Sequence, residues 1–312
     1  MITTRAYSIM EHLTIKNALL AFAAYRAYKM VYPTEVKSLE GKTVLVTGAG
    51  GGLGLAVIQE LRNRKCGKMI LWDIKQDALD RAAKEAGNHA HVTMIVDMSK
   101  REAIYEAIKS IPEADLPHYI FNIAGIVSGK YVCENSDEID LLTFHVNALA
   151  HLWMIKGFLP LFEKRGEGHF VNVSSMAAFV GATGMVAYAS SKSAAMMICQ
   201  SLNHELKHRN SPVKITSVCP SHFHTPLFEG FEYFGNLSMT PEYVAQKLIQ
   251  GTLAERELVI LPQYLISTWP SMALFQMNGF LNIVEFDKKN PMKKWGGSNH
   301  ASDVFRAMGA SL

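Results

Sequence analysis

Short apolar runs alternate with longer stretches of helical periodicity between residues 40 and 262. The runs are of strand length and rich in β-branched residues, which is typical of strands buried on both faces. The stretches between them place apolar residues three and four apart, as amphipathic helices do. Seven strands are therefore predicted, at residues 43–47, 69–73, 92–96, 119–122, 169–174, 214–219 and 257–261.

Strands that alternate with helices favour right-handed crossovers, and hence a parallel sheet with helices on both faces. The predicted fold class is α/β, a single doubly wound Rossmann domain with a parallel seven-stranded sheet over residues 40–262. No internal repeat or low-complexity linker divides this range. We expect an apolar membrane-anchoring extension before it, at residues 1–39, and an apolar lid or membrane-docking segment with a basic tail after it, at residues 263–312.

The composition fits a globular protein with a substantial core. Of the 312 residues, 49% are hydrophobic and 19% are charged, and the formal net charge is +3. So small a net charge does not indicate nucleic acid as a partner. The four cysteines form no Cys-x-x-Cys pair. We therefore expect reduced thiols in a cytosol-facing protein, and neither a zinc site nor a disulfide framework.

The N-terminal extension contains an uncharged run, NALLAFAAY, at residues 17–25. This run is shorter than the about 20 residues that a membrane-spanning helix needs. Arg26 and Lys29 stand where a secretory signal would have small cleavage-site residues. We expect a membrane-surface anchor with flanking basic side chains, or alternatively a helix packed against the domain.

A second apolar stretch, residues 261–286, follows the last predicted strand. Pro262 and Pro270 interrupt it, which argues against a straight transmembrane helix. It is expected to form a lid or a membrane-docking helix, or else to pack in a dimer or extend the core. The basic run KKNPMKKW that follows suits an anionic membrane surface, although such runs also occur on ordinary solvated faces.

A glycine-rich turn, TGAGGGLG at residues 47–54, joins the first predicted strand to a helix. Glycines allow the backbone to approach a pyrophosphate, whose charge then lies at the positive end of the helix. The second predicted strand ends in Asp73, about 20 residues further on, as the dinucleotide fingerprint requires. These features predict a dinucleotide site.

The cofactor preference depends on Asp73. A carboxylate here would accept hydrogen bonds from the adenosine ribose and repel the additional phosphate of NADP. NAD is therefore favoured, with NADP as the alternative because Lys75 could reach a phosphate. Asp73 could also be a helix cap or turn residue. Asp97 could bond the adenine amine or start a helix, and the NIAG turn at residues 122–125 could admit a nucleotide or simply form a turn.

Tyr188 and Lys192 lie one helical turn apart in AYASSK and share a helix face. Only about one free tyrosine in a thousand is ionised at neutral pH, and a nearby cation would lower its pKa. Ser175 ends a predicted strand, where ligands bind in doubly wound sheets, and could hold a substrate oxygen. Asn147 could supply a polar group or a helix-borne water. Alternatively, Ser175 is a cap and Asn147 a satisfied core amide.

Over residues 40–262 the sequence resembles the short-chain dehydrogenase/reductases. TGAGGGLG matches the T-G-x-x-x-G-x-G of that family and YASSK its Tyr-x-x-x-Lys. Ser175, Asn147 and the Asn-x-Ala-Gly turn match in order and spacing. The resemblance implies that Ser175 orients the substrate oxygen and that Tyr188 is the general acid and base. It also implies that Lys192 binds the nicotinamide ribose and lowers the tyrosine pKa, while Asn147 supports a proton relay through water.

The resemblance further implies which residues contact the cofactor. Two departures concern this contact surface: Ile123 replaces the second Asn of the common Asn-Asn-Ala-Gly, and Ser221 stands in PSHFHTP where Pro-Gly is common. No third ligand accompanies His222 and His224, so we expect a polar rim there and no metal. The implied cofactor residues are Gly48, Gly50, Gly52, Leu53, Gly54, Asp73, Asp97, Asn122, Ala124, Gly125, Tyr188, Lys192, Pro220 and Thr225.

The apolar extensions and Asp73 make the chain similar to the membrane-associated retinol dehydrogenase and hydroxysteroid dehydrogenase branch. That branch implies retinoid, steroid or similar lipid alcohols and carbonyls as substrates, on the cytosolic side of the endoplasmic reticulum or lipid droplets. The family implies a homodimer through helices around residues 148–163 and 187–209. Two alternatives are an NADPH-dependent ketoreductase of lipid synthesis and a non-enzymatic membrane or lipid-droplet scaffold. The intact Ser175, Tyr188 and Lys192 argue against the scaffold.

Overall fold

The computed structural model describes residues 17, 21–22, 37–228 and 238–263. The chain divides into two compact units, Met1–Lys37 and Ser38–Leu312. In the first unit, residues 17, 21 and 22 are helical and exposed. Most of the expected anchor at residues 17–25, and nearly all of the expected lid at residues 263–312, lie outside the described residues. Within the described part of the chain, no helix has the length and apolar character needed to cross a membrane.

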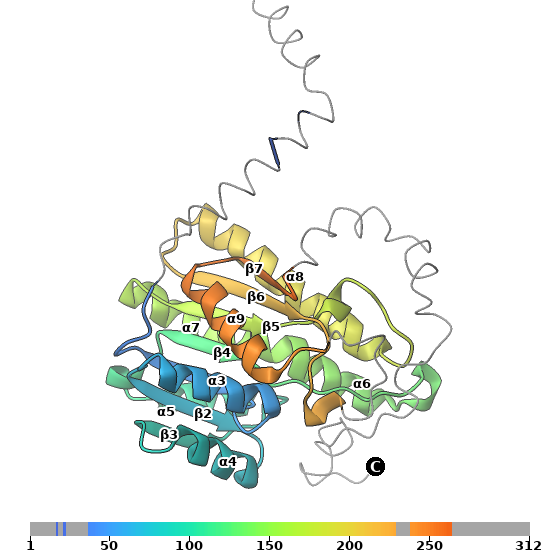
Figure 1. Cartoon of the computed structure of the whole chain (residues 1–312), viewed down its shortest axis with the longest axis horizontal. Helices are drawn as coiled ribbons and strands as arrows, with labels where there is room; N and C mark the ends of the chain where they lie inside the picture. The colour runs from blue at the N-terminus through green and yellow to red at the C-terminus, as the bar shows by residue number, and fades with distance from the viewer. Residues whose placement is uncertain (1–16, 18–20, 23–36, 229–237, 264–312) are drawn as a thin grey trace, which may run out of the picture. The chain divides into compact units, whose positions relative to one another are not determined.

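A parallel sheet forms the centre of the second unit (Figure 1). Its strand order is β3-β2-β1-β4-β5-β6-β7, so the chain moves outward from β1 to β3 and then returns to continue on the other side of β1. A ligand binds in a doubly wound sheet where the order reverses, here between the carboxyl ends of β1 and β4. The predicted fold class is confirmed. The strands are β1 Thr43–Thr47, β2 Lys68–Asp73, β3 His91–Ile95, β4 Tyr119–Asn122, β5 His169–Val173, β6 Lys214–Pro220 and β7 Leu258–Leu261.

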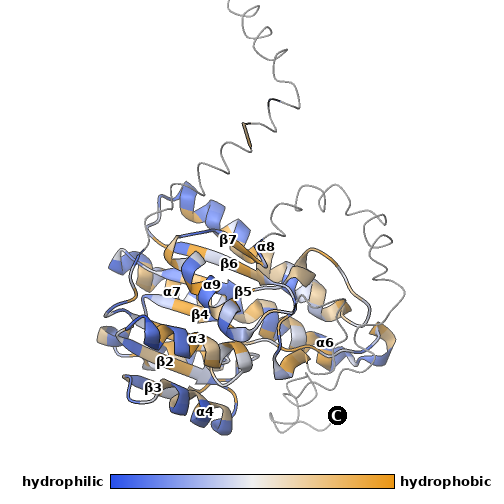
Figure 2. Ribbon diagram, in the orientation of Figure 1, coloured by the Kyte–Doolittle hydropathy of each residue, from blue (hydrophilic) through white to orange (hydrophobic). Residues whose placement is uncertain are grey.

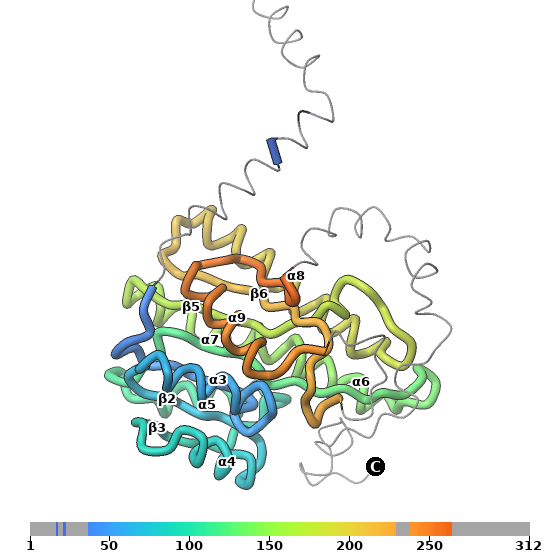
Figure 3. Tube along the Cα trace, in the orientation of Figure 1, coloured from blue at the N-terminus to red at the C-terminus, as the bar shows by residue number. Residues whose placement is uncertain are grey.

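Helices cover both faces of the sheet (Figure 1). The Cα trace shows α3 and α9 side by side, although they come from opposite ends of the domain sequence (Figure 3). The α-helices are α3 Gly52–Asn63, α4 Gln76–Ala86, α5 Arg101–Ser110, α6 Asp137–Phe144, α7 Ala150–Arg165, α8 Val186–His208 and α9 Pro241–Leu253. Shorter elements are the 3-10 helices η1 Glu113–Asp115, η2 Val132–Glu134, η4 Met176–Ala178 and η5 Pro226–Phe228, and the π-helix η3 His145–Leu149.

Successive residues of the central strands enter two different cores, one on each face of the sheet. In β1, Val44 and Val46 join the core beneath α3 and α9, whereas Leu45 joins the core beneath α5, α7 and α8. This is the alternation that a pleated strand imposes. Figure 2 accordingly shows mainly apolar strands and helices with hydrophilic outer faces. Fully buried side chains such as Phe158 and Phe170 each stabilise the fold by roughly 1.5–3 kcal/mol.

The third strand departs from the prediction. The apolar run at residues 92–96 was expected to be buried on both faces, but Val92 and Ile95 are 42% and 58% exposed. The reason is topological, because β3 lies at the edge of the sheet and, among the described strands, pairs with β2 alone. A sequence run shows that a strand forms, but its place in the sheet decides how much of it is covered.

Local sequence signals fix the ends of several helices. Thr240 caps α9, since its hydroxyl accepts a hydrogen bond from the N–H of Tyr243 at 3.2 Å, and Pro241 occupies the first turn. Gly166 ends α7 with a φ of 82°, and its N–H donates to the carbonyl of Phe162 at 2.9 Å. These local signals set where α9 begins and where α7 ends.

Candidate active site

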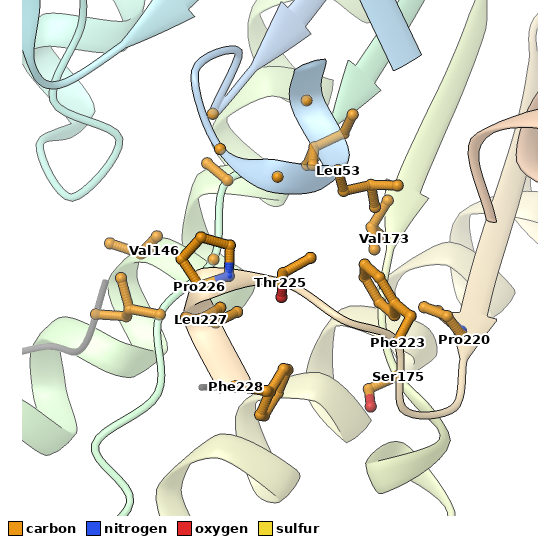
Figure 4. Close-up of a pocket in the computed structure, with 18 of the residues that line it drawn as sticks. Leu53, Val146, Val173, Ser175, Pro220, Phe223, Thr225, Pro226, Leu227 and Phe228 are labelled. Atoms are coloured by element: carbon orange, nitrogen blue, oxygen red, sulfur yellow. The ribbon is translucent and has the colours of Figure 1, made fainter. Parts of the chain in front are cut away.

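A cavity of about 900 Å³ opens at the carboxyl ends of the strands. The turn between β1 and α3 forms one wall, and the ends of β4 and β5 form its floor. The segment that follows β6 closes the opposite side. Figure 4 shows Leu53 of the glycine-rich turn facing Thr225, Pro226 and Phe228 across this space. The cavity therefore lies at the switch point that the topology indicates.

The glycine-rich turn is held tightly against its neighbours. Gly48 has a φ of 65°, and a Cβ there would lie 2.9 Å from the Cα of Ala124. The hydroxyl of Thr47 accepts hydrogen bonds from the N–H groups of Ile123 at 3.1 Å and Ala124 at 3.2 Å. The ends of β1 and β4 are thus joined, and the N-terminus of α3 opens into the cavity.

Asp73 lines the cavity at the end of β2 and also supports the turn. Its Oδ2 accepts a hydrogen bond from the N–H of Gly50 at 3.0 Å, and its Oδ1 one from Ile74 at 2.8 Å. Burial raises the pKa of this carboxyl, whereas the backbone N–H donors and the charge of Arg81 oppose the rise. Asp73 is therefore a turn residue, as one interpretation of the sequence had it, and its carboxylate also lies beside the cavity. The contact with an adenosine ribose stays a prediction.

Two cations stand near Asp73, Lys75 and Arg81, and both line the cavity. Arg81 is paired with Asp77 at 2.8 Å across one turn of α4. The sequence patterns indicated Lys75 but not Arg81. Arg81 comes near Asp73 because α4, which carries it, packs beside the glycine-rich turn. A phosphate bound near Asp73 would meet both cations.

Asp97 and Asn122 differ in their relation to the cavity. Asp97 lines it, and its Oδ1 also accepts hydrogen bonds from the N–H and hydroxyl of Ser99, so it caps the turn before α5 as well. Asn122 was expected to contact a cofactor, yet its side chain is buried and donates to Asn172 Oδ1 at 2.7 Å. The reason is the strand register, which sets Asn122 opposite Asn172 beneath the floor.

The remaining residues expected to bind a cofactor line this one cavity. Thr225 adds an independent sign of a ligand site, because its hydroxyl oxygen is buried and has no hydrogen-bond partner among the described residues. An unmet buried hydroxyl is costly unless a ligand or water completes it. The residues in the wall are Gly48, Gly50, Gly52, Leu53, Gly54, Asp73, Asp97, Ala124, Gly125, Tyr188, Lys192, Pro220 and Thr225.

Ser175, Tyr188 and Lys192 converge at the inner end of the cavity. Ser175 follows β5, and its Oγ accepts the N–H of Ala177 at 3.1 Å as a cap of η4. Its hydroxyl also lies close enough to the Tyr188 phenol to oppose the rise in the pKa of that phenol. The Lys192 ammonium lies 5.8 Å from the centre of the Tyr188 ring and donates to the carbonyl of Val173 at 2.8 Å. The three residues form one polar group in the wall of the cavity.

The electrostatics of this group correct one expectation. Lys192 was expected to lower the pKa of Tyr188, but burial raises the pKa of Tyr188 to about 12, with the Ser175 hydrogen bond opposing. Burial also lowers the pKa of Lys192 to about 8. Desolvation dominates because both groups are buried, and the ammonium is directed to the Val173 carbonyl. The protein alone therefore keeps the phenol protonated at neutral pH.

Asn147 lies in the π-helix η3 and is fully buried beneath the cavity wall. Its Oδ1 accepts from the N–H of Ile126 at 2.9 Å, and its Nδ2 donates to the Ile126 carbonyl at 2.9 Å and to Ser191 Oγ at 3.0 Å. This is the satisfied core amide that the sequence left open as an alternative. A π-turn is frequent at functional sites, and here it brings the amide to the loop after β4 and to α8.

The side of the cavity away from Asp73 is apolar and aromatic. The Phe228 ring makes edge contacts with Tyr188 at 5.8 Å and with His222 at 6.0 Å between centroids. His222 and His224 are 5.8 Å apart, and burial lowers the pKa of His222 to about 4. The sequence motifs did not identify the apolar residues here, which are Met176, Val180, Met185, Phe223, Leu227 and Phe228.

The sequence profile of the short chain dehydrogenase family matches residues 42–232. Human estradiol 17-beta-dehydrogenase 11 is 34% identical over 258 residues, which cover 81% of this chain and 86% of that protein. Mouse epidermal retinol dehydrogenase 2 is 34% identical over 237 residues, covering 73% of this chain and 76% of that protein.

The fold has relatives among solved structures. A short chain dehydrogenase/reductase from Burkholderia phymatum, in complex with NAD, superimposes with a TM-score of 0.69. The two sequences are 21% identical, and the alignment covers 78% of this chain and 97% of that one. At this identity the likeness concerns the fold alone.

Proposed function

The chain belongs to the short-chain dehydrogenase family, and we propose that it exchanges a hydride between NAD and the alcohol or carbonyl group of a hydrophobic lipid, with Tyr188 as general acid and base. Membership of the family makes it an NAD(P)-dependent oxidoreductase acting on CH–OH groups. The observation that carries the proposal is the convergence of Ser175, Tyr188 and Lys192 in the cavity that the glycine-rich turn borders.

The residues of the cavity fit a nicotinamide dinucleotide. The N-terminus of α3 would receive the pyrophosphate, Asp73 the adenosine ribose, and the unmet hydroxyl of Thr225 the nicotinamide amide. When bound, the cofactor supplies or accepts the hydride. The chain itself then has to hold the substrate and move one proton.

The proton step falls to the three polar residues. Ser175 would hold the substrate oxygen beside Tyr188, since its hydroxyl lies close enough to the phenol to influence the pKa of Tyr188. In alcohol oxidation the ionised Tyr188 takes the hydroxyl proton, and in carbonyl reduction the neutral phenol gives it back. Lys192 would stabilise the ionised phenol and bind the nicotinamide ribose through the N–H groups that Val173 does not use. Asn147 would support this arrangement by fixing the loop after β4 against Ser191.

Asp73 supports NAD as the preferred cofactor, because a second phosphate near its carboxylate would be repelled. NADP remains the alternative. Arg81 makes NADP binding more favourable than Lys75 alone would, because it is a second cation that could meet the additional phosphate. The pairing of Arg81 with Asp77 at 2.8 Å commits that guanidinium to an existing partner. We therefore keep the preference for NAD.

The apolar half of the cavity supports a lipid substrate. Phe228, Met185 and Leu227 surround the approach to Tyr188, and a hydrophobic alcohol would bury its hydrocarbon there. The two relatives named above, an estradiol dehydrogenase and a retinol dehydrogenase, favour steroids or retinoids. Such a substrate partitions into membranes. We accordingly propose association with the cytosolic face of the endoplasmic reticulum or lipid droplets.

A homodimer is proposed through α7 and α8. The exposed apolar side chains Val186 and Met197 of α8 support it, being 56% and 52% exposed. Single exposed apolar residues are common, but two on one long helix suit a self-complementary surface.

The test is a cofactor-reduction assay over a panel of lipid alcohols in detergent, with NAD and NADP offered separately. We expect turnover with NAD, and its loss in Tyr188→Phe while NAD binding, measured by fluorescence titration, persists. Tyr243→Phe, at a partly exposed tyrosine of α9, is the matched control and should stay active. Equal activity in Tyr188→Phe would refute the mechanism. Cofactor binding without turnover of any alcohol or carbonyl would favour a scaffold.

A further inference from the structure

Two histidines, His222 and His224, follow β6, and the proposed reaction uses neither of them. The structure divides this pair. The side chain of His222 lines the cavity, whereas His224 is exposed and does not belong to the described wall. Their rings lie 5.8 Å apart between centroids. Of the two histidines, His222 is the one placed to meet a substrate.

The backbone on both sides of His222 is fixed by hydrogen bonds. The N–H of Ser221 donates to the carbonyl of Leu261, at the end of the neighbouring strand β7, at 2.7 Å. The carbonyl of His222 accepts the N–H of Met239 at 3.3 Å, and the N–H of His224 donates to the carbonyl of Met239 at 3.2 Å. The fold thus holds the imidazole beside the cavity, as a residue that selects substrates requires.

One aromatic ring connects the reacting group with His222. The ring of Phe228, which lines the cavity (Figure 4), makes edge contacts with Tyr188 at 5.8 Å and with His222 at 6.0 Å between centroids. Phe228 therefore contacts both residues. A lipid whose reacting carbon lies at Tyr188 can extend its hydrocarbon over Phe228, which brings its other end to His222.

The described wall carries little charge on this side of the cavity. Apart from Lys192, its charged side chains come from the ends of β2 and β3 and from α4, and they are Asp73, Lys75, Asp77, Arg81 and Asp97. Burial, and then the charge of His224, lower the pKa of His222 to about 4, so the ring is neutral at physiological pH. A neutral imidazole has one donor and one acceptor. It suits a hydroxyl or a carbonyl, and it provides no charge to balance a carboxylate, sulfate or phosphate.

We propose that His222 is a specificity-determining residue, which hydrogen-bonds an uncharged hydroxyl or carbonyl at the end of the lipid remote from the reacting carbon. This inference rests on the proposed function, because it concerns the far end of the same substrate. It also narrows the substrate class. A steroid with an oxygen at each end meets both Tyr188 and His222, whereas retinol, with one oxygen, meets Tyr188 alone.

The test uses matched alcohols with NAD in detergent. Straight-chain alkanols from decanol to hexadecanol are compared with diols that carry a second hydroxyl on the last carbon, and with ω-hydroxy acids that carry a carboxylate there. At the chain length that spans Tyr188 and His222, we expect the kcat/KM of the wild type for the diol to exceed that for the alkanol about tenfold, after allowance for the two equivalent ends. The ω-hydroxy acid should be the poorest substrate at pH 7.

His222→Phe keeps an aromatic ring against Phe228 but has no donor or acceptor. It should abolish the preference for the diol by raising KM, because the second hydroxyl then loses its hydrogen bonds to water without replacement. The kcat/KM for the alkanol should stay close to the wild-type value. His222→Gln, which keeps a donor and an acceptor, should recover most of the preference. His224→Leu, at the exposed neighbour, is the matched control and should retain the preference.

Thermal unfolding of each variant identifies a folding defect, and His222→Leu repeats the measurement if His222→Phe does not fold. The inference is overturned if the wild type prefers the alkanol at every chain length, or if the ω-hydroxy acid is the best substrate. It is also overturned if a folded His222→Phe keeps the preference for the diol or loses activity equally toward diol and alkanol.

Failure of the proposed function gives a different result. A wild type that oxidises no alcohol of the series, and neither estradiol nor retinol, refutes the proposed function. Calorimetric titration of the diol and the alkanol into the NAD-bound wild type and His222→Phe then decides on His222. Tighter binding of the diol that is lost in His222→Phe supports its role, and equal affinities in the two proteins overturn it.

Discussion

The carboxylate of Asp73 accepts a hydrogen bond from the backbone N–H of Gly50 at 3.0 Å. The residue proposed to select the cofactor therefore also fixes the turn proposed to bind its phosphates. A change at Asp73 must affect cofactor preference and turn stability together, because one side chain serves both.

Asp73→Ala should weaken NAD binding by at least about tenfold and reduce the preference for NAD over NADP. It should also lower the free energy of unfolding by about 1–3 kcal/mol, since the Gly50 N–H loses its partner. Fluorescence titration with each dinucleotide and urea unfolding measure the two effects. Asp80→Ala, which removes an exposed carboxylate of α4, is the control. An unchanged ratio of NAD to NADP affinity in Asp73→Ala would contradict the proposal.

The pH dependence of the reaction should follow the protonation of the buried Tyr188 and Lys192. The base form of Tyr188, whose pKa is raised to about 12, grows about tenfold per pH unit below that value. The kcat/KM for alcohol oxidation should therefore rise from pH 7, and the rise should slow above about 8, where Lys192 loses its proton. Carbonyl reduction uses the protonated phenol and should not rise. Oxidation that falls between pH 7 and 8 would show that another group controls the step.

Gly125→Ala should impair catalysis without unfolding the protein. The added Cβ would lie 3.3 Å from Lys192 Nζ and Asn147 Oδ1, so both side chains would have to shift by a few tenths of an ångström. We expect kcat/KM to fall about tenfold, because proton transfer is sensitive to position. Gly181→Ala is the matched control, since nothing lies within 4 Å of a Cβ there. Equal kcat/KM values in the two variants would show that the space at Gly125 does not matter for catalysis.

Acid should destabilise the fold through buried histidines. The pKa of His151 is lowered from 6.5 to about 3, and that of His222 to about 4, so the unfolded chain binds protons that the folded chain excludes. The stability present above pH 6.5 should be lost progressively as the pH falls toward 3. In His151→Leu the loss should be smaller. Urea unfolding from pH 7 to 4 measures it, and an equal slope in wild type and variant would show that the His151 ring is already charged when folded.

The sequence by itself determined the strands, the doubly wound sheet, the glycine turn and the Ser175, Tyr188 and Lys192 set. These follow from local patterns: continuous apolar runs of strand length, glycines where the backbone must turn, and two reactive residues one helical turn apart. Each of these signals is contained in a few consecutive residues, so the chain order alone reveals it.

Only the tertiary structure decided the environment of these groups. Burial keeps the Tyr188 phenol protonated, strand register removes Asn122 from the cavity, and the edge position exposes β3. The unpartnered and buried His151 ring depends likewise on what surrounds it in the fold. Desolvation and long-range charge depend on what surrounds a residue in space, and residues far apart in the chain supply those surroundings.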